Sequence, residues 1–302
     1  METRAERAST ARGLLAAPVV VAVLVMVVWG ATPVLTRIAL DDMEPLVVAT
    51  LRTIIAGLLA APLLLRAREP FPRATSARRL LAVSAAAGFV VFPVVYTVGQ
   101  ERTSGLHGVM ILAALPIFTG LYAAAVERRL PTRGWLVGCA IALAGEVVLI
   151  GARGGGTGEA TLTGDLIVLA AALVVSAGYV AGALLPPRGV SRSAATFWGV
   201  VLGAIVLSPL ATVLFADDGL PDAGWRAWGA VLVLAVVTSV IGYIGWYWAL
   251  DRGGIARIST VQFLQPLSGF ALAVVVLGDR VTPAIAVGAA AIVCGVVIAQ
   301  RA

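Results

Sequence analysis

Long apolar segments alternate with short polar connections along almost the whole of the 302-residue chain. A helix needs about 20 predominantly apolar residues to cross roughly 30 Å of hydrocarbon. The pattern therefore predicts an all-α membrane protein with ten transmembrane helices. We place these spans at about 15–40, 45–65, 79–99, 104–126, 133–151, 164–185, 192–215, 225–249, 256–277 and 283–300.

Residues 238–280 have the same layout as a segment 150 residues earlier. Each segment reads as two apolar helices joined by a short polar turn, and similar residues occupy the equivalent positions. A match at a fixed period indicates that the chain is a duplicated unit. The matched pairs are Tyr96 and Trp246, Glu101-Arg102 and Asp251-Arg252, Pro116 and Pro266, Gly138 and Gly288, and Gly145 and Gly295.

Each half would contain five spans, an odd number, so the second half enters the membrane in the opposite orientation. Two inverted five-helix repeats (5+5) are a common plan of secondary transporters, with the substrate site near the bilayer midplane between the halves. The glycine run at 154–156 is typical of a flexible linker. We therefore divide the chain into a cytoplasmic N-terminal tail (1–14), a first repeat (15–151), a linker (152–163) and a second repeat (164–300).

Composition supports a membrane location. The chain is 60% apolar and 13% charged, whereas soluble globular domains carry roughly 25% charged residues. So few charges could not solvate a soluble surface of this size. All 22 basic residues are arginine and most lie in short loops, so the basic charge does not indicate nucleic-acid binding.

The arginines are divided unevenly between the two sets of connections. Of the 20 arginines in loops and termini, 16 lie at the chain ends or after even-numbered spans, Arg73 and Arg129 among them. Because cytoplasmic connections are enriched in arginine, we expect both termini in the cytoplasm and the protein in the inner (cytoplasmic) membrane. The N-terminal run also suits a cleaved signal peptide, but it lacks a clear small-x-small cleavage site, so we keep it as the first span.

Short motifs spread over nearly the whole chain resemble, in their order and spacing, those of the drug/metabolite transporter superfamily, EamA-type branch. They are Trp29-Gly30, Arg52, Gly164-Asp165-Leu166, Gly242-Tyr243, Ala249-Leu250, Pro266 and Leu277-Gly278-Asp279-Arg280, with His107-Gly108 and Pro116-Ile117-Phe118. The resemblance implies transport of small metabolites, often export. It also implies that spans 1–4 and 6–9 surround a central cavity and that spans 5 and 10 are peripheral.

The chain departs from the family pattern at two acidic residues. Asp279 stands where the family has glutamate. Glu127 lies 11 residues after Pro116, whereas Asp279 lies 13 residues after Pro266. The two acids therefore do not occupy equivalent positions in the halves.

Polar and aromatic side chains within the apolar spans are the candidates for a substrate cavity. In span eight, Tyr243, Trp246 and Tyr247 share one helical face, and two glutamines follow in span nine. Amide side chains at membrane depth are expected to face a neighbouring helix or water rather than lipid. We expect the cavity to include Trp29, Arg52, Tyr96, His107, Trp198, Tyr243, Trp246, Gln262 and Gln265.

Several of these residues also have a structural interpretation. Gln262 and Gln265 can tie neighbouring helices together. Tyr247 and Trp248, near the cytoplasmic end of span eight, are more typical of membrane-interface anchors than of ligand contacts. His107, at the outer start of span four, can titrate or bind substrate, or it is a histidine at the membrane interface.

Arg52 is the expected fixed positive charge of the cavity. An arginine in the outer half of the membrane is costly unless it faces water, an acid or the bundle interior, and its forked guanidinium suits a carboxylate. Its counterpart in the second half is Trp198, which pseudo-symmetry would bring toward the same axis. Alternatively, Arg52 pairs with an acid or with helix-end carbonyls and only holds spans together.

Hydroxyl, acidic and proline residues mark helix starts and bends. Thr132 and Thr282 are expected N-caps, and Asp165 can cap span six. A proline inside a helix frees a backbone carbonyl one turn earlier. We expect helix bends at Pro33, Pro116 and Pro266.

The sequence predicts a secondary transporter, not an enzyme, that moves small amphipathic metabolites such as amino acids by alternating access, as an exporter. An efflux pump for aromatic or cationic drugs is the alternative within transport, although no central carboxylate is evident to meet a cation. An intramembrane hydrolase would need a pair such as Ser104 and His107, but these lie at one helix start beside no evident oxyanion loop. A structural membrane subunit is the remaining alternative.

The expected partners are a small-molecule substrate, the lipid bilayer, and a proton or an exchanged metabolite, but not nucleic acid. The single histidine cannot build a His-rich metal site, and we expect neither a metal nor a cofactor. Cys139 and Cys294 both fall in apolar spans, where they behave as small apolar residues rather than as a disulfide pair.

Overall fold

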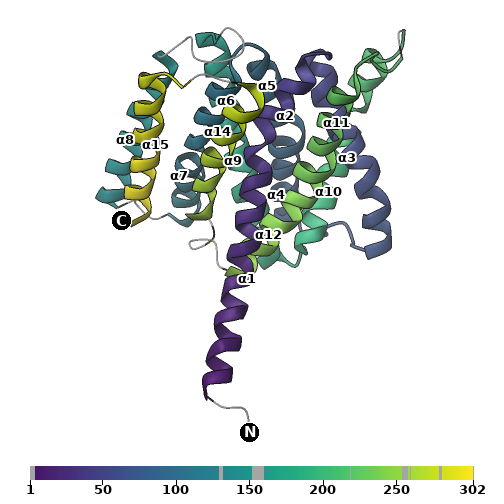
Figure 1. Cartoon of the computed structure of the whole chain (residues 1–302). Helices are drawn as coiled ribbons and strands as arrows, with labels where there is room; N and C mark the ends of the chain where they lie inside the picture. The colour runs from purple at the N-terminus through teal and green to yellow at the C-terminus, as the bar shows by residue number, and fades with distance from the viewer. Residues whose placement is uncertain are drawn as a thin grey trace.

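A computed structural model describes residues 4–128, 132–151, 160–217, 219–253, 258, 260–278 and 281–301, and every regular element in these ranges is a helix. The first half contains α1 (Arg4–Gly30), α2 (Thr32–Leu40), α3 (Pro45–Ala67), α4 (Thr75–Ala85), η1 (Ala86–Val91), α5 (Phe92–Glu101), α6 (Gly105–Ile111), η2 (Leu112–Ala114), α7 (Leu115–Glu127) and α8 (Arg133–Gly151). The second half contains α9 (Leu162–Ala183), η3 (Pro186–Arg188), α10 (Arg192–Leu214), α11 (Trp225–Val233), η4 (Leu234–Ile241), α12 (Gly242–Gly253), η5 (Thr260–Phe263), α14 (Leu264–Leu272), η6 (Ala273–Leu277) and α15 (Pro283–Arg301) (Figure 1).

Seven helical stretches among the described residues are long and apolar enough to cross a membrane. They are Ala17–Leu40, Pro45–Ala67, Thr75–Glu101, Gly105–Val126, Leu162–Ala183, Arg192–Leu214 and Trp225–Leu250. Three shorter apolar helices, Arg133–Gly145, Leu264–Leu277 and Pro283–Gly295, lie at the remaining expected positions. This confirms a multi-pass helical membrane protein, while the count of ten spans stays a prediction.

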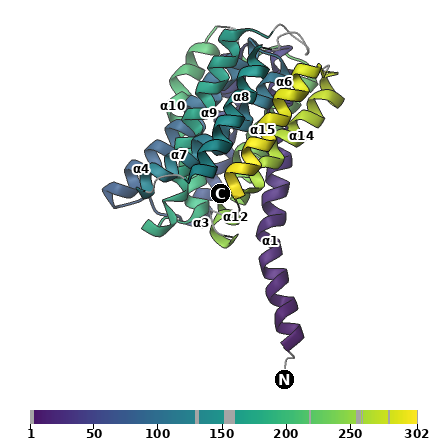
Figure 2. The ribbon, with the colours of Figure 1, turned by 90° about the vertical axis from the view of Figure 1, so that its left-hand side faces the viewer.

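Helices from the two halves of the chain pack against each other throughout the bundle. α8 lies side by side with α15 at one edge (Figures 1 and 2), and α3 packs along α10. In the interior, α1 packs on α12 and α14, whereas α9 packs on α5 and α7. The largest hydrophobic core of the described residues therefore gathers aromatic side chains from both halves, namely Trp29, Phe89, Phe92, Tyr96, Tyr179, Tyr243 and Trp246.

The contact between α8 and α15 depends on the close approach of two backbones. A Cβ atom on Gly145 would lie 2.7 Å from the carbonyl oxygen of Gly288, and one on Gly295 would meet the carbonyl oxygen of Gly138. Small residues that let backbones approach closely are a general feature of helix packing in lipid. Glycine at these two positions therefore allows the pair to form.

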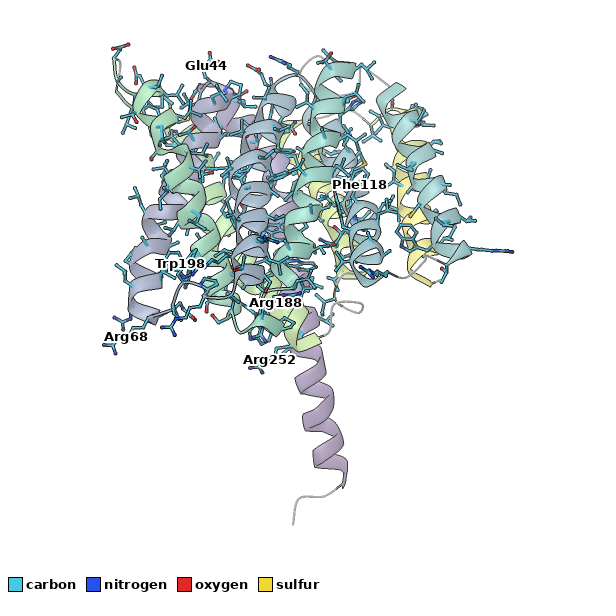
Figure 3. The ribbon with its side chains drawn as sticks, turned by 180° about the vertical axis from the view of Figure 1, so that it is seen from behind. Glu44, Arg68, Phe118, Arg188, Trp198 and Arg252 are labelled. Atoms are coloured by element: carbon cyan, nitrogen blue, oxygen red, sulfur yellow. The ribbon has the colours of Figure 1, made fainter. Side chains whose placement is uncertain are left out.

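The two ends of the bundle differ in charge. The N-terminal part of α1 projects from one end (Figures 1 and 2). Figure 3 places Arg68, Arg188 and Arg252 at this same end and Glu44 at the opposite end. The labelled arginines thus lie together, as their distribution in the sequence predicts. Which end faces the cytoplasm stays a prediction.

Two predicted N-caps are confirmed. The Thr132 hydroxyl accepts a hydrogen bond from the N–H of Trp135, and the Thr282 hydroxyl accepts one from the N–H of Ile285, each at 3.2 Å. These bonds satisfy backbone donors at the starts of α8 and α15 that have no partner within the helix.

The predicted cap by Asp165 is wrong. α9 begins at Leu162, and Thr161 caps it by accepting from the N–H of Gly164 at 3.0 Å. Asp165 therefore lies within the first turn, where its side chain is available for other contacts. It contacts residues from the first half of the chain, as described below.

Helix geometry changes beside each proline expected to mark a bend. A single residue separates the end of α1 from the start of α2, which begins next to Pro33. The 3₁₀-helical segments η2 and η5 come shortly before Pro116 and Pro266. A proline removes a backbone donor and crowds the preceding turn, and a 3₁₀ turn is a usual accommodation. Asp279, which stands where the family has glutamate, lies outside the described residues.

Two π-helical segments interrupt the bundle, η1 between α4 and α5 and η4 between α11 and α12. They occupy related places in the two halves, because residues 86–91 shifted by the 150-residue period fall on 236–241, inside η4. π-Helical turns are frequent at functional sites. Here η4 contributes directly to the centre of the bundle.

Candidate functional site

Arg52 of α3 is buried at the centre of the site, with 4% of its surface exposed. Its Nη2 donates to the hydroxyls of Thr238 at 3.3 Å and of Ser239 at 3.2 Å, both on η4. Nε and Nη1 are buried without a hydrogen-bond partner among the described residues. No carboxylate of those residues forms an ion pair with Arg52. Hydroxyl groups alone therefore meet this charge.

The π-helical turn explains why two adjacent hydroxyls accept from one guanidinium. The hydroxyls of Thr238 and Ser239 both donate to the carbonyl oxygen of Leu234, at 2.5 and 2.9 Å. Their own protons are thereby used within η4. Their oxygen lone pairs remain to accept from Arg52, so the contact between α3 and η4 is well satisfied on the hydroxyl side.

Trp29 of α1 is fixed by a hydrogen bond to the same turn. Its Nε1 donates to the backbone carbonyl of Thr238 at 3.0 Å. A Cβ atom on Gly242 would lie against this indole nitrogen. The absence of a side chain at Gly242 therefore lets the indole reach the carbonyl.

Aromatic rings surround Trp29. The ring of Tyr179 on α9 is stacked on it at 5.6 Å with an interplanar angle of 9°, and Tyr243 and Trp246 of α12 lie at 5.2 and 5.7 Å between centroids. Stacked and tilted arrangements at these distances are favourable for aromatic pairs. The cluster joins α1 and α9 with α12.

One cavity, which we term the Arg52 cavity, has about 350 Å³ of space between its atoms, open solvent included. Its polar groups are the guanidinium, two threonine hydroxyls, two phenols, one indole and one amide. The lining residues are Trp29, Thr32, Arg52, Phe92, Leu112, Leu115, Tyr179, Thr238, Tyr243 and Gln265.

A second cavity, the Gln262 cavity, has about 550 Å³ of space between its atoms, open solvent included. Both amide atoms of Gln262, Nε1 of Trp246 and the hydroxyl of Thr119 are buried without a hydrogen-bond partner among the described residues. Most of the remaining wall is aliphatic. The lining residues are Thr119, Ala123, Val126, Tyr179, Val180, Ala183, Leu184, Trp246, Leu250 and Gln262.

The two cavities lie on either side of the aromatic cluster. Tyr179 lines both, Trp29 lines the Arg52 cavity, and Trp246 lines the Gln262 cavity. Together they contain six of the nine residues expected in the cavity from the sequence: Trp29, Arg52, Tyr243, Trp246, Gln262 and Gln265.

Tyr96 lies beside the Arg52 cavity rather than in its wall. It is fully buried and donates from its hydroxyl to Oε1 of Gln100 at 2.8 Å. Its ring stacks on Phe92 at 5.1 Å, and Phe92 lines the Arg52 cavity. Tyr96 therefore supports the wall from behind.

The expectation that Trp198 approaches Arg52 is wrong. Trp198 packs edge-on against Phe71, with centroids 5.0 Å apart, and lies toward the arginine-rich end in Figure 3. It is the seventh residue of α10, counted from that end, and Arg52 is the eighth residue of α3. Inverted repeats are related by a two-fold axis in the membrane plane, which exchanges the two ends of the bundle. Equivalent residues that lie far from the midplane are therefore far from each other.

His107 lines neither the Arg52 cavity nor the Gln262 cavity. It is fully buried, and its Nδ1 lies 3.1 Å from Oδ2 of Asp165. Tyr247, expected as an interface anchor, is also buried, and its hydroxyl lies 3.4 Å from that of Ser84. In both cases a polar atom of the side chain contacts a residue of another helix.

Comparison with known proteins identifies the family. The sequence model of the EamA-like transporter family matches residues 16–151 and 162–300. The chain belongs to this family. It is therefore a membrane transporter and not an enzyme, and the two matches cover most of each half of this EamA-like protein.

Relatives of this EamA-like transporter carry related functions in their names. It is 32% identical over 276 residues to the transporter YdeK of Bacillus subtilis, covering 89% of this chain and 92% of that one. It is 28% identical to a probable terminal-alkyne amino-acid exporter of Streptantibioticus cattleyicolor, and 27% identical to a probable amino-acid metabolite efflux pump of Salmonella typhimurium. Each of these two alignments covers 92% of both chains.

A solved crystal structure has the same fold. It matches with a TM-score of 0.65 at 22% identity, covering 94% of this chain and 96% of that one. The arrangement of helices in this EamA-like transporter is thus found in an experimental structure.

Sequence reasoning missed Tyr179, Thr238 and Ser239 as site residues. Tyr179 is the single aromatic residue among positions 164–185, so an isolated phenol in an otherwise aliphatic span was an available signal. The hydroxyl pair was the only adjacent Thr-Ser pair in span eight. Its role depends on the π-helical turn, which periodicity does not reveal.

Proposed function

We propose that this EamA-like transporter exports small amphipathic metabolites that carry a carboxylate, amino acids among them, across the inner membrane by alternating access. The names of two relatives, an amino-acid exporter and an amino-acid metabolite efflux pump, support this substrate class. The geometry around Arg52 supports the carboxylate.

The guanidinium of Arg52, which has no acidic partner among the described residues, is the observation that carries the proposal. Burying a charge is costly unless it is paired and hydrogen-bonded, and two of the three nitrogens of Arg52 lack a partner while the residue lines a cavity. A carboxylate bound there would accept from one of these two nitrogens, and the edge that this nitrogen shares with Nη2 would make the contact bidentate. The described residues that line the two cavities include no acid, which disfavours a cationic drug as substrate.

The uncharged part of the substrate would occupy the Gln262 cavity. This cavity offers one amide, one indole N–H and one hydroxyl without partners, beside aliphatic walls. Ligand sites are typically apolar with a few placed polar groups. The aromatic cluster between the cavities would then contact the middle of the substrate.

Alternating access would use two inverted five-helix repeats, 15–151 and 164–300. Three observations support this division. The family model matches the chain in two segments, helices pair across the halves as α8 with α15 and α3 with α10, and the irregular segments η1 and η4, like η2 and η5, recur at related positions. Such repeats rock against each other around a fixed site in many secondary transporters.

Transport by the purified protein in liposomes tests the proposal. We expect saturable movement of labelled L-phenylalanine and little movement of L-phenylalaninamide, which has the same ring and amine but no carboxylate. Liposomes that contain the Arg52→Gln protein are the matched control. Equal transport of acid and amide would contradict a carboxylate-binding role for Arg52.

A further inference from the structure

A fully buried acid–imidazole pair joins the two halves away from both cavities. Nδ1 of His107 on α6 lies 3.1 Å from Oδ2 and 3.3 Å from Oδ1 of Asp165 on α9, and neither side chain is exposed. The hydroxyl of Thr103 also donates to Oδ1 of Asp165. Nε2 of His107 is buried without a hydrogen-bond partner among the described residues. The pair therefore has a carboxylate on one side and an unused nitrogen on the other.

We propose that His107 and Asp165 form the proton-binding site that couples export of the substrate to entry of a proton. This inference rests on the proposed transport function. Imidazole is the side chain whose charge changes near neutral pH. The neutral imidazole and the carboxylate together carry one negative charge, and a proton bound to the ring makes the pair net neutral.

Burial links this proton to the state of the transporter. A net charge is disfavoured in a site without water, so the closed pair retains its proton. Release to water requires that this part of the bundle opens. In each cycle the imidazole takes a proton from water on one side, holds it as an N–H of the imidazolium, and releases it to water on the other side. No other bond forms or breaks.

The pair lies where relative movement of the halves would disturb it. α6 belongs to the first half and α9 to the second. The N–H and hydroxyl of Thr161, at the start of α9, both donate to the carbonyl oxygen of Arg102, at 3.1 and 2.8 Å. These two bonds hold the connection before α6 against the start of α9, close to the pair. Opening of this region would separate His107 from Asp165 or admit water to them.

Contacts of α5 lie between the start of α6 and the Arg52 cavity. The backbone N–H of His107 donates to Oγ of Ser104 at 3.1 Å, and Nε2 of Gln100 donates to the carbonyl oxygen of Ser104 at 3.1 Å. Tyr96 donates to Oε1 of Gln100, and its ring stacks on Phe92, which lines the Arg52 cavity. Movement of α6 relative to α9 would therefore act on contacts that adjoin the substrate site.

Other charged groups near this region do not contact the pair. Glu101 and Arg102, which precede α6, pair with each other at 3.9 Å, with side chains 42% and 51% exposed. Arg37 is half-buried on α2, which packs on α6, and the side chain of Glu146 on α8 lies outside the described part. Glu101, Arg102 and Arg37 form neither a hydrogen bond nor an ion pair with His107 or Asp165. The remaining arginines on helices packed against α6 or α9 adjoin the arginine-rich connections: Arg78, Arg79, Arg133 and Arg252.

The protonation of His107 can be observed directly, because it is the only histidine in the chain. Full-length protein carrying ¹⁵N-labelled histidine in lipid nanodiscs gives one imidazole signal set by NMR. We expect this signal to change with pH as the ring binds a proton, and the charged form to be less populated in Asp165→Asn at the same pH, because a neighbouring carboxylate favours the charged ring. A ring that never takes up a proton, or an Asp165→Asn protein with the pH dependence of the wild type, would overturn the proton site.

Coupling is tested in liposomes with labelled L-phenylalanine as the probe. We expect a pH gradient to drive its accumulation by the wild-type protein. In Asp165→Asn, accumulation falls to the level seen without a gradient, while exchange at equal pH continues. Glu101→Gln removes an exposed carboxylate at the same end and keeps both activities. His107→Gln is the second variant if Asp165→Asn does not fold.

The outcomes separate this inference from the proposed function. Gradient-driven accumulation that persists in Asp165→Asn, or equal loss of exchange and accumulation in a folded variant, would overturn coupling through this pair. Failure of the wild-type protein to move any amino acid would overturn the proposed function and the coupling with it. The histidine titration tests proton binding in either case.

Discussion

The guanidinium of Arg52 combines a structural contact with an unused one. Nη2 ties α3 to η4, whereas Nε and Nη1 have no partner among the described residues. Lysine offers a point charge and cannot reproduce a bidentate contact, and a hydrogen bond to a charged group contributes about 1.5–3 kcal/mol. We expect Arg52→Lys to raise the apparent KM for a carboxylate substrate by about tenfold or more, and Arg52→Gln to nearly abolish transport, in initial-rate measurements with proteoliposomes.

The alternative role of Arg52 as a helix tie gives a different result. Thr238→Val removes one hydroxyl that accepts from Nη2 and leaves Nε and Nη1 in place. We expect this variant to lose some thermal stability while keeping its KM. A folded Arg52→Gln protein that moved its carboxylate substrate at the wild-type rate would leave Arg52 with the structural role alone.

Trp246 and Gln262 are the polar groups of the second cavity contributed by α12 and η5. Neither indole nor amide has a partner among the described residues, so neither ties helices together by a hydrogen bond there. We expect Trp246→Ala and Gln262→Ala to lower transport at unchanged expression, with Gln262→Ala the milder in its effect on thermal stability. Trp248→Ala is the control. Trp248 lies in the same helix but outside the wall of this cavity, and the guanidinium of Arg252 lies over its ring, 5.8 Å from the centroid. Parallel loss of stability and transport in Gln262→Ala would favour the helix-tie role.

Single residues of the site could be predicted where chemistry alone decided them. A buried arginine, an indole and two amides in apolar spans indicated polar contacts without reference to the fold. Trp198 and His107 were misplaced because their positions depend on which helix faces them. Trp198 packs on Phe71, which lies in the connection between α3 and α4, and His107 contacts Asp165, an acid 58 residues away. No local sequence pattern predicts either contact.

At the scale of helices, the peripheral pair α8 and α15 can be tested apart from the site. A Cβ on Gly145 would approach the backbone of Gly288 at 2.7 Å, so a larger side chain forces the helices apart. We expect Gly145→Val to lower stability by about 1–3 kcal/mol and to lower the thermal midpoint in detergent. Transport per folded molecule stays near wild type, because neither helix lines the Arg52 cavity or the Gln262 cavity. Ala144→Val, next to it but exposed, is the control, and equal destabilisation by both would contradict the close-approach argument.

Helix positions and starts followed from the sequence more closely than helix geometry did. Apolar length and N-cap threonines are local signals, so the helices lie within a few residues of the predicted spans, except that α1 begins at Arg4, within the predicted N-terminal tail. The π-helical η1 and η4 were not predicted, because no residue type specifies an extra residue per turn. They matter for function, since η4 directs Thr238 and Ser239 toward Arg52. Asp165 shows the same limit, because Thr161 took the cap that a carboxylate could also have made.

At the scale of the molecule, pairing between halves explains why the site is central. α1 of the first half packs on α12 and α14, and α9 of the second half packs on α5 and α7. An interior helix of each half thus packs on helices of the other half. Trp29 of α1 and Tyr179 of α9 stack on each other there. A single half could not form either cavity, because residues 16–151 and 162–300 each supply part of both walls.

The charge difference between the two ends predicts the orientation of the whole molecule. Arg68, Arg188 and Arg252 lie at the end from which α1 projects, and Glu44 lies at the other (Figure 3). Cytoplasmic connections are enriched in arginine, so we expect this end, with both termini and the connection containing Arg73, to face the cytoplasm. Single cysteines at positions 73 and 44, introduced after Cys139 and Cys294 are replaced by serine, can be treated in intact cells with a thiol reagent that does not cross the membrane. Modification of position 44 alone is the expected result, and modification of position 73 alone would reverse the orientation.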